Sequence, residues 1–153
     1  MPSTVSELFA AADLEPEGCV RWGQPVPERR TGVYVVSLTP ATDELAGTLS
    51  RCPIDEDALR ELLRVRPELL VDGERPSVEQ LGERLAAFWL ADEIALYIGR
   101  AGVPLRKRVG QYRRSRLGAE SPHSGGWFLK TLSVLDDLWV HWSTTDDLSL
   151  IHI

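Results

Sequence analysis

The stretch EIALYIGRAGVPLRKRVGQYRR (residues 93–114) has an apolar strand pattern in its first part and a basic helical pattern in its second. Its first part, EIALYIG (93–99), combines branched aliphatic and aromatic side chains and ends in glycine, which predicts a strand. Pro104 suits the first turn of a helix. At about 100° per residue, the positions that follow form one apolar face, made of Leu105, Val109 and Tyr112. The segment therefore predicts a strand followed closely by an amphipathic helix.

Positive charge is concentrated in the same segment. Residues 100–116 contain no acidic side chain and seven basic ones: Arg100, Arg106, Lys107, Arg108, Arg113, Arg114 and Arg116. The whole chain has 17 Lys and Arg against 23 Asp and Glu, so the remainder has 10 basic and 23 acidic residues. A segregated basic patch indicates an anion-binding surface, most commonly for phosphate. The alternative is a solvated helix face that pairs with carboxylates elsewhere in the chain.

Arg108 differs from its basic neighbours in its predicted position. On the helical projection it lies beside the apolar face, next to Tyr112. The residues that point outward are Arg106, Lys107, Arg113 and Arg114. Burying an unpaired charge is costly, so a half-buried guanidinium needs an anion or several acceptors. The sequence therefore predicts that Arg108 binds an anion at the edge of the core.

Length and composition predict one ordinary globular domain. The chain has 153 residues, 43% of them hydrophobic and 26% charged, which is too apolar for a disordered segment. Cys19 and Cys52 lie outside any Cys-x-x-Cys spacing, which favours free thiols in a reducing compartment. The longest apolar run, Leu85–Ala91, is too short to span a membrane, and the N-terminus lacks a signal-peptide pattern. We expect a cytoplasmic protein with no membrane partner.

The rest of the chain predicts two further strands and three helical segments. The strands are GVYVVSL (32–38) and DLWVHWS (137–143). Capping boxes at Thr4-x-x-Glu7 and Ser77-x-x-Gln80 predict helices, the first ending near Leu14, and a third helix runs from about Asp55 until Pro67 stops it. After Ser77 a predicted core stripe comprises Val78, Leu81, Leu85, Phe88 and Trp89. Residues 15–31 predict a loop, and 127–135 a helix or a strand, with a helix favoured.

Two of the strands share a glycine–tyrosine pattern. Gly32-Val33-Tyr34 opens the first, and Tyr97-Ile98-Gly99 closes the second. With the helix LRKRVGQYRR behind them, these motifs resemble the GIY-YIG nuclease family, and HSGGWFLKTL (123–132) is similar to its stand-alone bacterial members. The resemblance covers residues 30–38 and 94–142. It implies a single α+β domain over 1–153, whose small three-stranded antiparallel sheet is flanked by helices, with 53–91 as a helical insertion between the first two strands.

The resemblance also implies a reaction, the metal-assisted hydrolysis of a nucleic-acid phosphodiester. The resemblance implies that Tyr34 orients or deprotonates the attacking water, that Tyr97 hydrogen-bonds in the same pocket, and that Arg108 binds the scissile phosphate. Tyr112 occupies a position where relatives carry His or Tyr. His123 is a further candidate, either for a phosphate contact or for capping its loop. The backbone contacts are expected from Arg100, Arg106, Lys107, Arg113 and Arg114.

The expected cofactor is Mg²⁺ or another divalent cation, and it is implied by the resemblance alone. The family's metal-binding glutamate lies after the third strand, but no glutamate follows Glu120 here. The later carboxylates are predicted loop and turn residues: Asp136, Asp137, Asp146 and Asp147. The metal ligands are therefore unknown, and the sequence ending is expected to be a truncated C-terminus rather than a degenerate family member.

Three functions remain open at this point. The first is an endonuclease, with DNA favoured over RNA as partner. The second is a nucleic-acid-binding module of the same fold that does not cleave. The third is a structural domain with a solvated basic helix. No separate DNA-reading module accompanies the domain, so low sequence specificity is expected.

Overall fold

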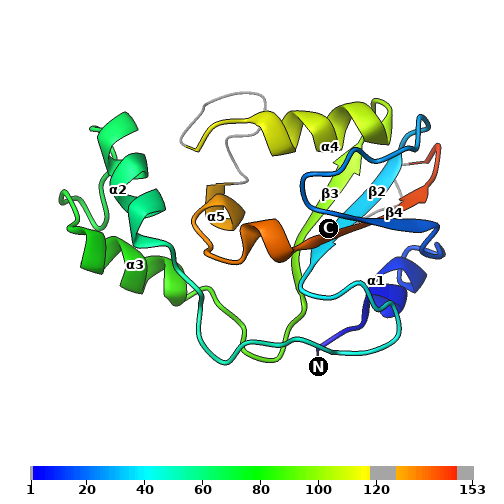
Figure 1. Cartoon of the computed structure of the whole chain (residues 1–153), viewed down its shortest axis with the longest axis horizontal. Coiled ribbons are helices and arrows are strands. Elements are labelled where there is room, and N and C mark those ends of the chain that lie inside the picture. Colours follow the sequence, from blue (N-terminus) through cyan, green and yellow to red (C-terminus); the bar gives the residue numbers. More distant parts are fainter. Residues whose placement is uncertain (1, 118–126, 148–153) are drawn as a thin grey trace.

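The computed structural model describes residues 2–117 and 127–147, which form an α+β fold. In chain order the elements are α1 (Val5–Ala10), β1 (Gly18–Arg21), β2 (Gly32–Ser37), α2 (Glu56–Val65), α3 (Val78–Ala86), β3 (Ala95–Ala101), α4 (Leu105–Arg114), α5 (Trp127–Lys130), the 3-10 turn η2 (Leu135–Asp137) and β4 (Trp139–Thr144). Helices α4 and α1 lie on opposite sides of the sheet, while α2 and α3 stand apart as a separate pair (Figure 1).

The described strands form one antiparallel sheet in the order β1-β4-β2-β3. Strand β2 lies between β3 and β4, and all six of its residues are buried. This explains why its sequence is almost continuously apolar rather than alternating. The three predicted strands are therefore present and adjacent, and they place the two glycine–tyrosine motifs side by side.

The expectation of a three-stranded sheet is wrong, because β1 adds a fourth strand from the segment predicted to be a loop. It pairs with the outer edge of β4, from Gly18 opposite Trp142 to Arg21 opposite Trp139. The glycine that suggested a loop is required by this pairing, since a Cβ at Gly18 would lie 2.2 Å from the Trp142 ring. Because β1 pairs with a strand more than a hundred residues away, no pattern within its own segment predicted it.

The sequence correctly predicted where α1, α2 and α3 begin, and each begins at a capping residue. The two predicted capping boxes form at Thr4 and Ser77, and the Asp55 side chain caps α2. Helix α1 ends at Ala10, short of the predicted Leu14. Helix α3 ends at Ala86, and the side chain of Phe88 beyond it is 66% exposed, so its predicted place in the core was wrong.

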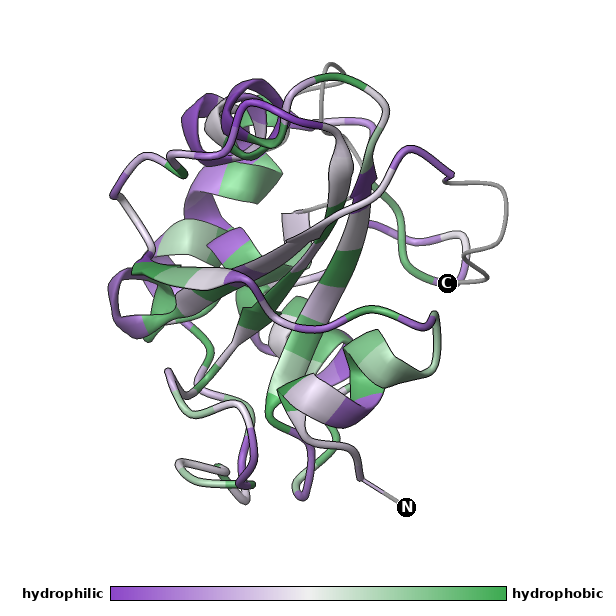
Figure 2. Ribbon diagram, turned by 90° about the vertical axis from the view of Figure 1, so that its right-hand side faces the viewer, coloured by the Kyte–Doolittle hydropathy of each residue, from purple (hydrophilic) through white to green (hydrophobic). Residues whose placement is uncertain are grey.

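The core has one cluster on each face of the sheet and a third between α2 and α3. Under α4, the largest cluster contains Tyr34, Val36, Leu105, Tyr112 and Trp142 among others. On the opposite face Val33 and Val35 pack against Val5 and Phe9 of α1. In Figure 2 the strands are largely apolar, whereas α4 above them is largely hydrophilic. Helix α4 therefore covers the core with one face and presents charge on the other.

Tyr34 and Gly99 form a close packing contact between the two motif strands. They are directly opposite each other in the β2–β3 register. A Cβ at Gly99 would lie 2.3 Å from Cζ of Tyr34 and 2.5 Å from its hydroxyl oxygen, so the Tyr34 ring crosses the space that a side chain would fill. Because Tyr34 is fully buried, its ring has no free space to move into.

We predict that Gly99→Ala destabilises the protein by about 1–3 kcal/mol, through overpacking against Tyr34. Gly82→Ala is the matched control, because a Cβ there would meet only Leu59 at 3.4 Å within helix α3. That variant should gain up to about 1 kcal/mol from helix propensity. Urea unfolding of both variants measures the difference, and equal stabilities would contradict the packing constraint.

Candidate functional site

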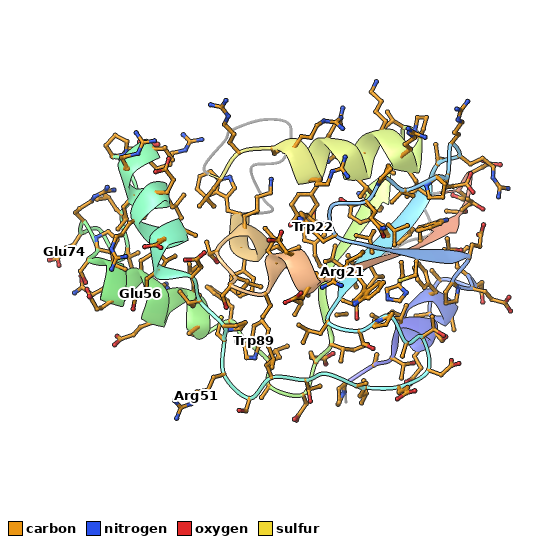
Figure 3. All side chains as sticks on the ribbon, viewed as in Figure 1. Arg21, Trp22, Arg51, Glu56, Glu74 and Trp89 are labelled. Carbon is orange, nitrogen blue, oxygen red and sulfur yellow. The ribbon has the colours of Figure 1, made fainter. Side chains whose placement is uncertain are left out.

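Three of the predicted site residues lie together beneath α4. Tyr34 and Tyr97 are diagonal neighbours on the same face of β2 and β3, with ring centroids 5.9 Å apart. The ring of Tyr112, from α4, lies 4.9 Å from that of Tyr97. Trp22 packs edge-on against Tyr112 at 5.4 Å, and Figure 3 shows it below α4. The sheet and the helix thus bring the tyrosines into one cluster.

The Tyr34 hydroxyl is buried without a hydrogen-bond partner among the described residues. Burial strongly raises the pKa of Tyr34, the neighbouring Tyr97 raises it further, and the positive charge of Arg108 opposes the rise. Burial likewise raises the pKa of Tyr112. Both phenols are therefore protonated at neutral pH, which suits them to donate hydrogen bonds rather than to accept a proton.

Arg108 has the partly buried position that the helical projection predicted. On the helix it stands beside Tyr112, at the edge of the face that covers the tyrosine cluster, and its positive charge acts on the Tyr34 phenol. Among residues 2–117 and 127–147 it forms neither a hydrogen bond nor an ion pair. By contrast, six arginines elsewhere do form ion pairs with carboxylates: Arg21, Arg30, Arg60, Arg64, Arg66 and Arg84. Arg108 is thus available to an anion from outside the protein.

Lys130 belongs to the site as well, and sequence reasoning missed it. Its ammonium donates hydrogen bonds to the carbonyl oxygens of Tyr112, at 2.6 Å, and Ser115. It also lies 5.4 Å from the centre of the Tyr112 ring. Lys130 therefore joins α5 to the C-terminal end of α4 and holds Tyr112 in place. The available signal was its position within HSGGWFLKTL, one of the blocks that carries the family resemblance.

The remaining predicted residues lie outside this cluster. Arg100 is exposed on β3. The outward-pointing positions predicted for Arg106, Lys107 and Arg114 are confirmed, since all three are exposed. Arg113 is partly buried instead, because its guanidinium donates to the carbonyl oxygen of Gly23. His123 lies outside the described residues, so its role stays a prediction. Two separate faces of α4 therefore carry the basic residues, one toward the tyrosines and one toward solvent.

The described residues do not assemble a metal site. Nowhere in residues 2–117 and 127–147 do three His, Cys, Asp or Glu side chains come together. The carboxylate of Glu17 instead accepts hydrogen bonds from Ser143 and Thr144. Asp137, one of the late carboxylates, forms an ion pair with Arg21. The residues that the structure describes therefore offer no ligand set for the Mg²⁺ that the resemblance implies.

Two other features have ordinary structural explanations. A hollow of about 380 Å³ lies between α3 and the segment that precedes it, but its arginines are already engaged, Arg75 by backbone carbonyls and Arg84 by Asp72. Cys19 and His141 lie 3.9 Å apart between Sγ and Nε2. Burial raises the pKa of Cys19 to about 11 and lowers that of His141, so the pair is neutral and unsuited to nucleophilic catalysis.

Comparison with protein-family models, with curated proteins and with solved structures found no significant match to this chain. Within the part of the chain that the structure describes, no helix has the length and apolar character needed to cross a membrane. The geometry of the tyrosine cluster and the charge on α4 are therefore the features from which we infer a function.

We predict that Tyr34→Phe leaves the protein as stable as the wild type, or more stable by up to about 1 kcal/mol. The substitution removes a buried hydroxyl that has no hydrogen-bond partner in residues 2–117 and 127–147, and such a group is destabilising. Tyr34→Ala, which also removes the ring, should cost about 3–5 kcal/mol. Chemical denaturation distinguishes the two, and a loss above about 1 kcal/mol in Tyr34→Phe would indicate a hydrogen bond at that hydroxyl.

A second prediction concerns Lys130 and pH. Burial lowers the pKa of its ammonium from 10.5 to about 8 in the folded chain. Between these values the unfolded chain binds more protons than the folded one, so this group makes stability rise as pH increases from about 8 to 10.5. Lys130→Met removes the effect. The stability of the wild type minus that of the variant should therefore increase across this range, and parallel pH profiles would contradict the pKa shift.

Proposed function

We propose that this chain binds the backbone of a nucleic acid at the tyrosine cluster and hydrolyses its phosphodiester bonds as an endonuclease. The observation that carries the proposal is that neither the partly buried guanidinium of Arg108 nor the buried hydroxyl of Tyr34, on which its charge acts, has a partner among the described residues. A phosphate diester offers what both groups lack, namely a negative charge and hydrogen-bond acceptors. The placement of β3, β2 and β4 as neighbours further supports the resemblance to GIY-YIG nucleases.

The roles of the residues follow from their protonation. Arg108 binds the scissile phosphate through its planar fork and offsets the negative charge that grows on the phosphoryl oxygens as water attacks phosphorus. The phenols of Tyr34 and Tyr97 orient the phosphate or the attacking water. Because burial raises the pKa of Tyr34, it acts as a hydrogen-bond donor rather than as the base that removes the water proton.

The proposed partner is DNA in preference to RNA, bound through backbone phosphates, and a divalent cation is the proposed cofactor. Both statements rest on the family resemblance. The described residues offer neither a metal-ligand set nor a base-reading element, so low sequence specificity remains the expectation.

The test is nicking of supercoiled plasmid in the presence of Mg²⁺ or Mn²⁺. We expect the wild type to nick, and Arg108→Ala and Tyr34→Phe to lose at least about 100-fold in rate, the effect of removing a transition-state contact. Arg51→Ala is the control, because Arg51 is exposed and lies far from α4 (Figure 3). Nicking that survives both site substitutions, or that Arg51→Ala also abolishes, would contradict the assignment.

A second candidate is a nucleic-acid-binding module that does not cleave. The observation that favours it is the lack of three grouped metal ligands among the described residues. Such a module would bind DNA with an affinity that falls steeply with salt, and it would show no nicking with any divalent cation. Loss of that binding in Arg108→Ala would then assign the tyrosine cluster to recognition alone.

A further inference from the structure

The solvent face of α4 carries a second cationic surface, here named the outer basic hollow. It has a volume of about 260 Å³ and is bounded on one side by residues 24–26. Its other side carries four basic side chains of α4: Arg106, Lys107, Arg113 and Arg114. Gly110 also lines the hollow, and the Arg114 guanidinium lies over it, 2.9 Å from where a Cβ would stand. The hollow is therefore a concave surface in which four of the nine lining residues are basic and none is acidic.

The wall opposite α4 is held in place by backbone contacts. The amides of Leu105 and Arg106 donate to the carbonyl oxygens of Arg30 and Glu28, each at 2.9 Å. At the other end of the helix, the Arg113 guanidinium donates to the carbonyl oxygen of Gly23. These bonds join the 23–30 segment to both ends of α4. The hollow is thus formed before any ligand arrives, which lowers the entropic cost of binding.

The four basic side chains lack carboxylate partners. Among residues 2–117 and 127–147 none of them forms an ion pair, although the chain is acidic and six of its other twelve arginines are paired with carboxylates. Four like charges on two turns of helix repel one another, at a cost that an anion would relieve. The alternative that this face pairs with carboxylates elsewhere in the chain finds no support in the described residues.

The outer basic hollow lies on a different face of α4 from Arg108. On a helix of about 100° per residue, Arg108 lies roughly 160° around the axis from the centre of the four outer side chains. A helix with its side chains is about 10–12 Å across, so one phosphate cannot contact both faces. Whatever binds in the hollow is a different group from the one held beside Tyr34.

The spacing of the charges favours a nucleic-acid backbone. Arg106 and Lys107 form one basic pair and Arg113 and Arg114 another, seven residues or about 10.5 Å further along the axis. Phosphates recur every 3.4 Å of helix axis along one DNA strand, so about three backbone steps match this separation. Three of the four side chains are arginines, whose planar forks suit phosphate oxygens.

We propose that the outer basic hollow binds a second run of phosphodiester backbone, so that nucleic acid contacts α4 on two opposite faces. The identity of the ligand rests on the proposed function, whereas the existence of a second site rests on the hollow alone. The bound nucleic acid must then extend past the helix, either as a bent duplex or as two separate strands.

The test is binding of a short fluorescein-labelled DNA duplex, followed by anisotropy in EDTA between about 50 and 200 mM salt. Two double variants probe the hollow, Arg106→Gln/Arg113→Gln and Lys107→Gln/Arg114→Gln. The second avoids the Arg113–Gly23 contact, and circular dichroism checks the folding of each. Arg60→Gln/Arg64→Gln on α2 removes the same charge from exposed positions away from α4.

We expect each hollow variant to weaken binding at least about tenfold at low salt and to reduce the magnitude of the salt slope by about 2, the loss of two phosphate contacts. The α2 control should bind as the wild type does, and Arg108→Gln should reduce the slope by about 1 or less. Wild-type affinity and slope in both hollow variants would overturn the second site, even if plasmid nicking continues. Binding to poly-glutamate in preference to DNA would overturn it in favour of an acidic protein partner.

The outcome separates this inference from the proposed function. Weakened binding in the hollow variants of a chain that never nicks DNA would support the second site and refute the endonuclease. If the wild type nicks DNA and the hollow variants bind DNA with wild-type affinity, the endonuclease is supported and the second site is refuted. A wild type that binds no DNA at all would overturn the second site together with the proposed function.

Discussion

The Tyr34 ring lies across Gly99, and the arrangement of the candidate site depends on that contact. In the pairing of the two motif strands Tyr34 stands opposite Gly99, two residues from Tyr97. The side chains of Tyr34 and Tyr97 therefore lie on the same face of the sheet. The same face is covered by α4, which places Tyr112 and Arg108 over the tyrosines. A side chain at residue 99 would displace the ring and separate the elements that form the cluster.

Helix α4 has to satisfy two opposed requirements. Its apolar residues close the largest core cluster, while its basic residues stay unpaired within the described part of the chain. The structure accommodates this through contacts at the helix ends, where backbone carbonyls of the 28–30 segment meet its first amides and Lys130 reaches its last carbonyls. Packing thus holds a helix whose charges, in isolation, would destabilise it.

Much of the site could be read from local sequence. The partly buried position of Arg108 followed from helical periodicity, and the two tyrosine–glycine motifs lie on neighbouring strands as predicted. Strand β1, Lys130 and the exposure of Phe88 did not follow. Strand β1 depends on pairing with β4, and Lys130 acts through carbonyls of a different helix, so each reflects contacts between distant segments. Phe88 fell outside the core because α3 ended before its periodic pattern did.

The sequence by itself determined the elements, the caps and the concentration of charge, because hydrophobic period, capping residues and composition act over a few neighbouring positions. Only the tertiary structure decided which of those charges are left without a partner. Pairing depends on whether a carboxylate from elsewhere comes within reach, and none does so for Arg108 or the outer basic hollow among the described residues. It also decided that the Tyr34 hydroxyl is buried, since the contact with Gly99 joins residues sixty-five positions apart.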